Sequence, residues 1–289
     1  MTDQRKAYSC AIAAVLLWST VGSAFKITLR HVEVLPLLFL ASLVSMGVLF
    51  CLAAFSKKLQ LLKTFAAKDY IHSALLGLLN PCLYYVALFT AYSRLPAQEA
   101  LTLNFTWPIM LVLLSIPLLE QKITGRSIIA ILISFGGVIV IGTHGNILAW
   151  STTDVAGVSL AVGSSVIWAL FWIYNIRDKR DEIIKLFLNF AFGSCFVFLA
   201  MLLFSDFRLP SVKGAAGAVY IGLFEMGITF LLWLKALKLS KTTAHIANLI
   251  YLIPFFSIVL IHFVVGEQIF LSTITGLVLI VAGIVLQKR

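Results

Sequence analysis

Charged residues are scarce in this chain, and their scarcity excludes most soluble folds. Asp, Glu, Lys and Arg make up 12% of the 289 residues, whereas 61% are hydrophobic and the mean hydropathy is +1.03. A soluble domain has roughly a quarter charged residues. Most of the surface must therefore face an apolar medium, and we predict an integral membrane protein whose surroundings are the lipid bilayer.

Cysteine is also rare, and it is not arranged for chemistry. The four cysteines lie in apolar stretches without paired spacing, which argues against a disulfide framework and against a metal site. The sequence has no phosphate-binding glycine loop, no HExxH motif and no nucleophile elbow. We therefore expect no metal, no cofactor and no enzymatic activity. An integral-membrane enzyme is a remote alternative, because the acidic residues are scattered and the loops are short.

Long apolar stretches, by contrast, fill almost the whole chain. A membrane-spanning helix needs about 20 predominantly apolar residues. The residues in these runs are apolar on both faces, so they lack the period-2 alternation of a transmembrane barrel. We predict an all-α integral membrane protein of ten transmembrane helices, at 7–29, 34–55, 70–93, 97–119, 124–142, 154–175, 182–204, 212–234, 242–264 and 269–287.

The net charge of +10 is explained by topology and implies no nucleic-acid partner. If the N-terminus is cytoplasmic, 17 Lys and Arg residues lie inside and four lie outside, namely Arg30, Arg94, Arg208 and Lys213. Lys26 lies near the end of the first predicted helix. Because cytoplasmic loops carry an excess of Lys and Arg, this distribution predicts that both termini are cytoplasmic.

The chain also repeats itself. Residues of one type recur at an offset of 145 or 146, as in the pairs Gly77 and Gly222, Ala91 and Ala236, Pro108 and Pro254, and Gly137 and Gly283. Each half, 1–146 and 147–289, then holds five predicted spans. An odd number makes the halves cross the membrane in opposite directions. Two inverted five-helix repeats around a central cavity are characteristic of secondary transporters.

An ionisable residue, Glu225, lies in the middle of the apolar run "GLFEMGITF" at 222–230. A carboxylate at mid-bilayer costs about 2.5–3.5 kcal/mol or more when it faces lipid, so we expect it to face the bundle interior or a wet cavity. At the 145 offset it corresponds to Asn80. In a continuous helix Asn80 shares a face with Tyr84, and we predict that both faces line one central cavity. The alternative is that Glu225 only holds the bundle together.

Further polar and aromatic residues within the spans are candidates for the same cavity. Aromatic walls with a few polar groups suit a partly apolar ligand, and an amide can bind the ammonium or carboxylate of a zwitterion, although Asn also commonly joins helices. Pro108 and Pro254 remove helical hydrogen bonds, which produces either a gate or a static kink. The predicted substrate-binding residues are Trp18, Asn80, Tyr84, Asn104, Trp107, Trp168, Glu225 and Asn248.

Several of these features resemble the drug/metabolite transporter superfamily, in its ten-helix EamA-type branch. They are Trp18, Lys26, Trp168, the two prolines and "GEQ" at 266–268. The segment 82–115, with "NFTWP" at 104–108, resembles the YddG-type aromatic amino acid exporters more specifically. This resemblance implies ten helices in two inverted halves, a location in the bacterial inner membrane, and movement of small metabolites out of the cytoplasm. The commoner EamA pattern has no Trp before the fourth-helix proline.

These observations together predict a secondary transporter that exports small metabolites by alternating access. Amino acids, aromatic or otherwise amphipathic, are the expected substrates. A drug, nucleoside or sugar derivative is the alternative, since neither charge nor spacing excludes it. Proton coupling and uniport both stay open, as does the oligomeric state, for which a monomer is compatible with one inverted repeat per chain.

Overall fold

The described part of the protein is entirely helical. The structure is a computed structural model, and it describes residues 3–119, 125–146, 154–205, 210–239 and 249–288. Seven helical segments within these ranges are long and apolar enough to cross a membrane: Gln4–Thr28, Val34–Phe55, Ala67–Arg94, Ala97–Leu118, Val155–Asn175, Glu182–Phe204 and Val212–Trp233. Three shorter apolar helices occupy Ile128–Ile141, Leu249–Val265 and Leu271–Leu286. The described residues therefore contain seven helices that are long and apolar enough to span a membrane, while the number ten stays a prediction.

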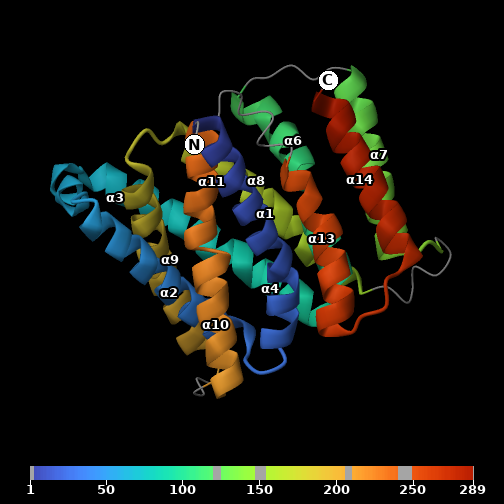
Figure 1. The fold of residues 1–289 in the computed structure, drawn as a ribbon, viewed down its shortest axis with the longest axis horizontal. Helices are drawn as coiled ribbons and strands as arrows, with labels where there is room; N and C mark the ends of the chain where they lie inside the picture. The colour runs from blue at the N-terminus through green and yellow to red at the C-terminus, as the bar shows by residue number, and fades with distance from the viewer. Residues whose placement is uncertain (1–2, 120–124, 147–153, 206–209, 240–248, 289) are drawn as a thin grey trace. The chain divides into compact units, whose positions relative to one another are not determined.

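The helices follow one another along the chain as Figure 1 labels them. Their bounds are α1 Asp3–Thr28, α2 Val34–Phe55, η1 Leu59–Thr64, α3 Ala67–Gly77, η2 Leu78–Leu83, α4 Tyr84–Arg94, α5 Ala97–Asn104, α6 Trp107–Leu119, α7 Gly125–Gly142, α8 Val155–Arg177, α9 Glu182–Phe204, α10 Val212–Phe224, α11 Ile228–Leu239, η4 Leu249–Leu252, α13 Ile253–Leu260, η5 Ile261–Val265 and α14 Leu271–Lys288.

Capping residues set the starts of three of these helices. Asp154, Asp181 and Ser211 each precede a helix and accept hydrogen bonds from its first amides, at α8, α9 and α10 respectively. Because the first four amides of a helix have no partner inside it, such caps are strongly preferred at this position. The short polar breaks that separate the predicted spans therefore also fix where the helices begin.

The helices form two compact units, and each unit takes helices from both halves of the chain. The first unit comprises residues 1–82 and 179–260, and the second comprises 83–178 and 261–289. These units do not coincide with the predicted halves 1–146 and 147–289, so the assignment of those halves as repeats stays a prediction.

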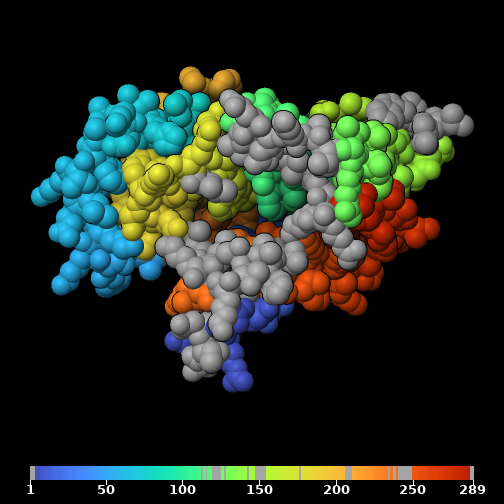
Figure 2. All heavy atoms as spheres, turned by 90° about the horizontal axis from the view of Figure 1, so that it is seen from above, coloured from blue at the N-terminus to red at the C-terminus, as the bar shows by residue number. Residues whose placement is uncertain are grey.

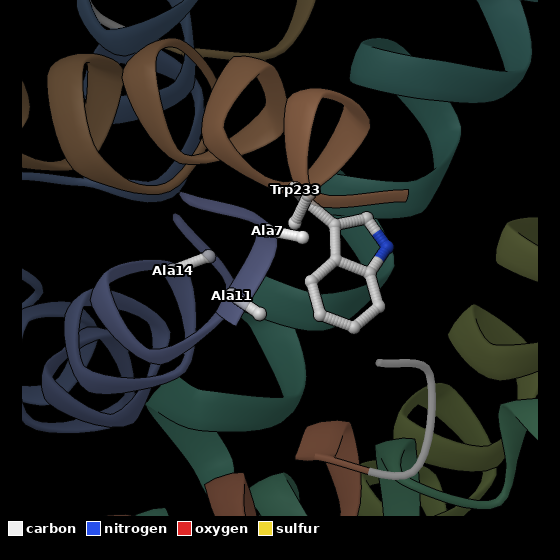
Figure 3. Packing of buried hydrophobic residues seen from close by; sticks show 5 residues of the cluster. Ala7, Ala11, Ala14 and Trp233 are labelled. Atoms are coloured by element: carbon white, nitrogen blue, oxygen red, sulfur yellow. The ribbon is translucent and has the colours of Figure 1, made fainter. Parts of the chain in front are cut away.

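In the first unit, α9 and α10 pack against α2, and α3 packs against α9. Figure 2 shows the side chains around α3, in cyan, beside those of α9, in yellow. The other side of the unit is built on α1, which contacts α10, α11 and α13. Ala7, Ala11 and Ala14 of α1 are fully buried and form one cluster with Trp233 of α11, and Figure 3 shows Ala7 and Ala11 beside the Trp233 ring. Small side chains on one helix thus make room for an indole on the next.

In the second unit, α8 contacts α4, α5 and α6, while α7 and α14 run side by side (Figure 1). Glycine permits the close approach of α7 and α14. A Cβ placed on Gly137 would lie 2.6 Å from the carbonyl oxygen of Gly276, and a Cβ on Gly283 would lie 2.5 Å from that of Ala130. Packing of this kind through small residues is how membrane helices attract one another without a hydrophobic driving force.

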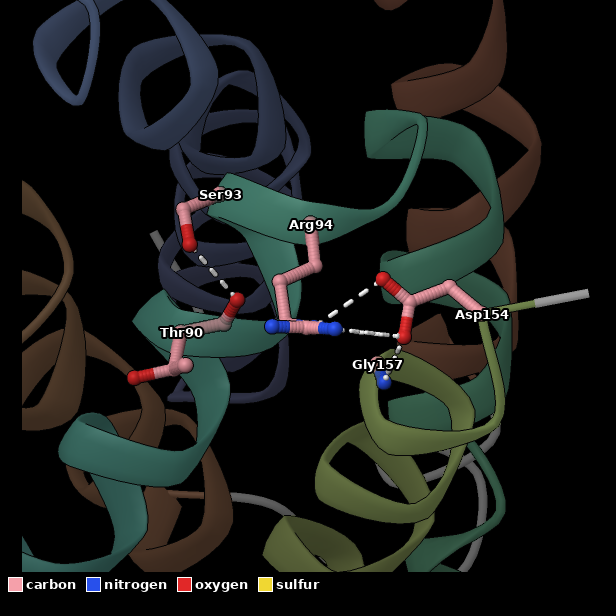
Figure 4. Close-up of polar contacts among 5 residues, drawn as sticks. All are labelled: Thr90, Ser93, Arg94, Asp154 and Gly157. Atoms are coloured by element: carbon pink, nitrogen blue, oxygen red, sulfur yellow. Dashed lines mark hydrogen bonds and ion pairs between the residues drawn. The ribbon is translucent and has the colours of Figure 1, made fainter.

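Ion pairs join helix ends within each unit. In the second unit, Nε of Arg94, at the end of α4, lies 3.0 Å from Oδ2 of Asp154 at the start of α8 (Figure 4). The amide of Gly157 and the guanidinium of Arg94 hold the pKa of Asp154 below its usual range. In the first unit, Nζ of Lys58 donates to Oδ2 of Asp181 at 2.7 Å. These polar ends mark where the helices leave the apolar region.

Candidate functional site

The third predicted span is not a continuous helix, because it breaks at Asn80. This residue has φ −147° and ψ 119°, and a cis peptide bond joins it to Pro81. Its side chain is fully buried, and neither its amide oxygen nor its amide nitrogen has a hydrogen-bond partner within the described protein. The expectation that Asn80 shares a helical face with Tyr84 is therefore wrong, since the backbone between them is not one regular helix.

The predicted span that contains Glu225 breaks as well. The helix α10 ends at Phe224, and α11 begins at Ile228. Side chains from two other helices satisfy the backbone carbonyls of the break. Oγ of Ser45 donates to the carbonyl of Met226 at 2.9 Å, and Nε1 of Trp18 donates to the carbonyl of Glu225 at 3.4 Å. The carboxyl side chain of Glu225 is 8% exposed. Two residues 145 positions apart, one an amide and one a carboxylic acid, thus both lie at helix breaks.

An aromatic cluster lies beside the break at Glu225. The ring of Trp18 meets Phe230 edge-on at 6.0 Å between centroids, and it meets Trp233 at 5.7 Å. Trp18 is partly buried, and its indole nitrogen is the group that reaches the Glu225 carbonyl. The backbone of Glu225 and three aromatic rings are therefore neighbours along α1, α10 and α11 of the first unit.

The second unit contains a similar combination of polar and aromatic groups. The Tyr84 and Trp168 rings stack with centroids 4.6 Å apart at 30°. The Tyr84 hydroxyl donates to Oδ1 of Asn104 at 3.4 Å, and Nδ2 of Asn104 donates to Oγ of Ser164 at 2.8 Å. These contacts bring α4, α5 and α8 together around one amide. Such a surface can hydrogen-bond a polar ligand and stack on an apolar one.

The two predicted gating prolines do not lie in helix interiors. Pro108 is the second residue of α6, after a break at Phe105 and Thr106, and Pro254 is the second residue of α13, after the 3-10 turn η4. Since the first amides of a helix have no partner inside it, proline fits this position without removing a helical bond. The helix in each case starts anew near the proline, within the apolar segments Ala97–Leu118 and Leu249–Val265, and a role of either proline as a gate or as a static kink stays a prediction. Trp107, the first residue of α6, is partly buried.

The predicted site residues are divided between the two units. Trp18, Asn80 and Glu225 belong to the first, and Tyr84, Asn104, Trp107 and Trp168 belong to the second. Asn248 lies outside the described residues. A single cavity that contains all of them stays a prediction.

A polar network at the start of α5 was not predicted from the sequence. The carboxylate of Glu267 accepts hydrogen bonds from the amides of Ala97 at 2.9 Å and Gln98 at 3.5 Å, so it caps α5 from a distant part of the chain. The Gln98 side chain donates to the carbonyl of Gln268 at 2.5 Å and accepts from the amide of Phe270 at 3.0 Å. The signal in the sequence was the motif "GEQ" at 266–268, which was used above only for the family resemblance. Among the described residues, no group of three or more His, Cys, Asp and Glu is placed to hold a metal ion.

Comparisons with known proteins give one consistent result. The sequence profile of the EamA-like transporter family matches residues 5–143 and 155–287. An uncharacterized transporter of Clostridium kluyveri is 24% identical over 293 residues, with 96% of this chain and 92% of that protein covered. The uncharacterized transporter YvbV of Bacillus subtilis is 29% identical over 285 residues, with 94% and 88% covered. One crystal structure, 21% identical, matches with a TM-score of 0.66 and covers 97% of this chain and 95% of that one, which is a likeness of fold.

Proposed function

Since the chain belongs to the EamA-like transporter family, we propose that it is a secondary transporter that exports amino acids or similar amphipathic metabolites by alternating access. The observation that carries this proposal is the Tyr84–Asn104–Trp168 cluster of the second unit. Its amide and hydroxyl groups suit the ammonium and carboxylate of an amino acid, and its stacked rings suit an apolar side chain. In the first unit, Glu225 and Trp18 offer the same two kinds of group.

We propose an inverted repeat of two five-helix halves, 1–146 and 147–289, as the architecture that permits alternating access. Three observations support it. The family profile matches two separate stretches of similar length. The helices break at both Asn80 and Glu225. Packing partners also correspond within the units, because α3 packs on α9 as α10 packs on α2, and α8 packs on α4 and α6 as α1 packs on α11 and α13.

The distribution of Lys and Arg supports a location in the bacterial inner membrane with both termini in the cytoplasm. In that orientation the end of α4 and the start of α5 face the exterior, while η1 and the start of α9 face the cytoplasm. Export then begins on the cytoplasmic side, which carries most of the Lys and Arg residues.

A flux measurement tests the proposed function. Liposomes that contain the purified protein are loaded with labelled amino acids, one at a time from a panel. The efflux of each amino acid is followed with and without a pH gradient. Nucleosides and sugar derivatives belong in the same panel, because the stacked Tyr84 and Trp168 rings also suit a flat heterocycle. Saturable efflux of at least one amino acid is expected. Efflux of nucleosides or sugars alone would replace the substrate class and leave the carrier assignment in place.

A pair of variants tests the site. If Asn104 binds substrate, Asn104→Ala leaves a polar substrate group unpaired, which costs about 1–3 kcal/mol and raises KM by about 5- to 150-fold. Ser165→Ala is the matched control, since it removes the neighbouring bond between Thr106 and Ser165, 2.9 Å long, without touching Asn104. Equal effects of the two variants on KM would assign Asn104 a purely structural role.

A further inference from the structure

A buried carboxylic acid in the second unit contacts an exposed histidine. Glu99 lies in the first turn of α5 and is 2% exposed, and its Oε1 lies 3.3 Å from Nδ1 of His144. This is an ion-pair distance without the alignment of a hydrogen bond. The side chain of His144 is 48% exposed. The imidazole thus has one side toward the surface and one toward the buried carboxyl group, which is the arrangement of a proton relay.

The position of His144 is fixed from two directions. The residue follows the C-terminus of α7 in the left-handed region, with φ 50°, and Gly145 follows with φ 78°. The amide of Gly145 donates to the carbonyl of Val140 at 2.9 Å, which closes the last turn of α7. The His144 ring also meets Phe270 edge-on, with centroids 5.8 Å apart. The imidazole is therefore held at Glu99 by the ends of two helices.

Opposing effects act on the charges of Glu99 and His144. A positive imidazolium is stabilised at the C-terminus of α7, and a carboxylate is stabilised at the N-terminus of α5. Burial of Glu99 opposes this charge separation, because an apolar environment disfavours an isolated carboxylate. The Glu267 carboxylate already accepts the amides of Ala97 and Gln98 at the same helix start, so a second negative charge there is disfavoured as well. Protonation of Glu99 therefore removes an unfavourable buried negative charge from this helix start.

The neighbouring charged groups are engaged elsewhere. Arg94 and Asp154, on the adjoining ends of α4 and α8, pair with each other. Nδ1 of His262 lies at hydrogen-bond distance, 2.8 Å, from the backbone carbonyl oxygen of Glu267. Among the described residues, the charged or titratable side chains at this end of the unit, on α4, α5 and α8 and on the segments that follow α7 and α13, are Tyr92, Arg94, Glu99, His144, Asp154, His262 and Glu267.

The helix α5 links this pair to the candidate substrate site. It is eight residues long and ends at Asn104, after which the chain breaks before α6. Asn104 follows Glu99 by five positions, which is about 7–8 Å along the helix axis. A movement of α5 at its capped start is therefore transmitted to the amide that contacts Tyr84 and Ser164.

We propose that Glu99 and His144 form a proton-binding site, and that this site couples proton movement to transport through α5. The proposal rests on the proposed function for its role in coupling, while proton binding itself is independent of any substrate. The pair takes up a first proton from the aqueous side at His144, which gives imidazolium with carboxylate, and a second proton at lower pH converts the Glu99 carboxylate to the carboxylic acid. A proton carried on the carboxylic acid relaxes the ion pair and frees the start of α5.

Infrared spectroscopy tests proton binding directly. Difference spectra of the protein in liposomes, recorded from about pH 5 to 8 where imidazole changes its charge, are expected to contain the carbonyl band of a protonated carboxylic acid. Glu99→Gln removes that band. The variant His144→Asn is suitable because asparagine tolerates the positive φ at this position. It is expected to move the midpoint of the carbonyl band to higher pH by about one unit or more, because an adjacent cation no longer favours the carboxylate.

Matched controls separate this site from the other candidates. Glu33→Gln changes an exposed carboxyl group that accepts from Ser205, and Glu225→Gln changes the buried one at the α10 break. The band is expected to persist in both. Absence of a band in the parent, a band that survives Glu99→Gln, or a midpoint that His144→Asn leaves in place would overturn the proposal. If no panel solute is transported while the infrared result holds, the transport assignment fails and the proton site stands.

Discussion

At the scale of single residues, each of the two helix breaks of the first unit carries a buried polar side chain, Asn80 and Glu225. The hydrogen bonds that stabilise the break at Glu225 use its backbone carbonyl and that of Met226, with Trp18 and Ser45 as donors. The carboxyl group is therefore not needed for these bonds. Its role can be tested without removing them.

We expect Glu225→Gln to fold like the parent, because the variant removes a desolvation penalty and keeps the shape and polarity of the side chain. If the carboxylate binds a substrate ammonium group, KM rises by about tenfold or more, since hydrogen bonds to charged groups contribute about 1.5–3 kcal/mol. Because the proton site is assigned to Glu99 and His144, the pH profile of flux keeps its shape. Efflux across about pH 5.5 to 8 measures both quantities. Parent-like flux at every pH would mean that Glu225 only holds helices together.

Asp181 offers a pH-dependent contribution to stability outside the apolar region. Desolvation raises the pKa of this carboxyl group, but hydrogen bonds from Lys58 and from the Ile184 and Ile183 amides outweigh it, so the pKa lies below its usual range. A depressed pKa in the folded state stabilises the fold at neutral pH. This contribution is lost as the pH falls from about 4 through the folded-state value.

Asp181→Asn keeps a good helix cap and removes the charge. The expected destabilisation is less than about 1 kcal/mol, because both partners are partly exposed, and the acid-dependent part of the unfolding curve becomes shallower. Thermal unfolding in detergent between about pH 3 and 7 measures the slope, with Lys58→Met and the double variant completing the cycle. Additive effects would show that the ion pair contributes nothing.

At the scale of elements, glycines determine which helices approach closely. A Cβ on Gly77 of α3 would lie 2.8 Å from the amide nitrogen of Gly193 in α9, and a Cβ on Gly222 of α10 would lie 2.5 Å from the carbonyl of Ala41 in α2. These two glycines are the repeat-related pair. In both cases the obstacle is backbone, which cannot rotate away.

We therefore expect Gly77→Ala and Gly222→Ala to separate their helices and to lower stability by about 1–3 kcal/mol, as overpacking does. Gly47→Ala in α2 and Gly163→Ala in α8 are matched controls, because nothing lies within 4 Å of either added Cβ. The controls should be neutral or slightly stabilising, since alanine is the better helix former. Folded yield and thermal midpoint in detergent measure the difference. Equal behaviour of the four variants would contradict the packing described for α3 and α10.

The sequence predicted the apolar helices well and their interruptions poorly. Length and hydropathy were sufficient for helices such as α2 and α9, because lipid requires every backbone group to be bonded within the segment. The break at Asn80 had a signal that we missed, since Pro81 restricts the residue before it to extended conformations. The break after Phe224 had only Gly227 as a signal. The contacts of Asn104 with Ser164, and of Glu99 with His144, depend on long-range packing that no local pattern encodes.

At the scale of the whole molecule, the orientation of the chain is the first property to test. With both termini cytoplasmic and an odd number of spans per half, residue 9 and residue 146 face opposite sides. In a cysteine-free background, Ser9→Cys should react with a membrane-impermeant maleimide only in inverted vesicles, and Asn146→Cys only in intact cells. Labelling of both from one side would contradict the inverted repeat.

The interleaving of the two compact units has a consequence for biosynthesis. The chain passes between units after residues 82, 178 and 260, so α2 and α3 have their partner α9 only when synthesis has reached residue 204. At 5–20 residues per second, the 122 residues between positions 82 and 204 take roughly 6–24 seconds to synthesise. During that interval the buried face of α3, followed by the buried Asn80 of η2, meets lipid or the insertion machinery instead of α9. We therefore expect nascent chains stalled before α9 to be more exposed to membrane quality-control proteases than chains in which α9 has been made.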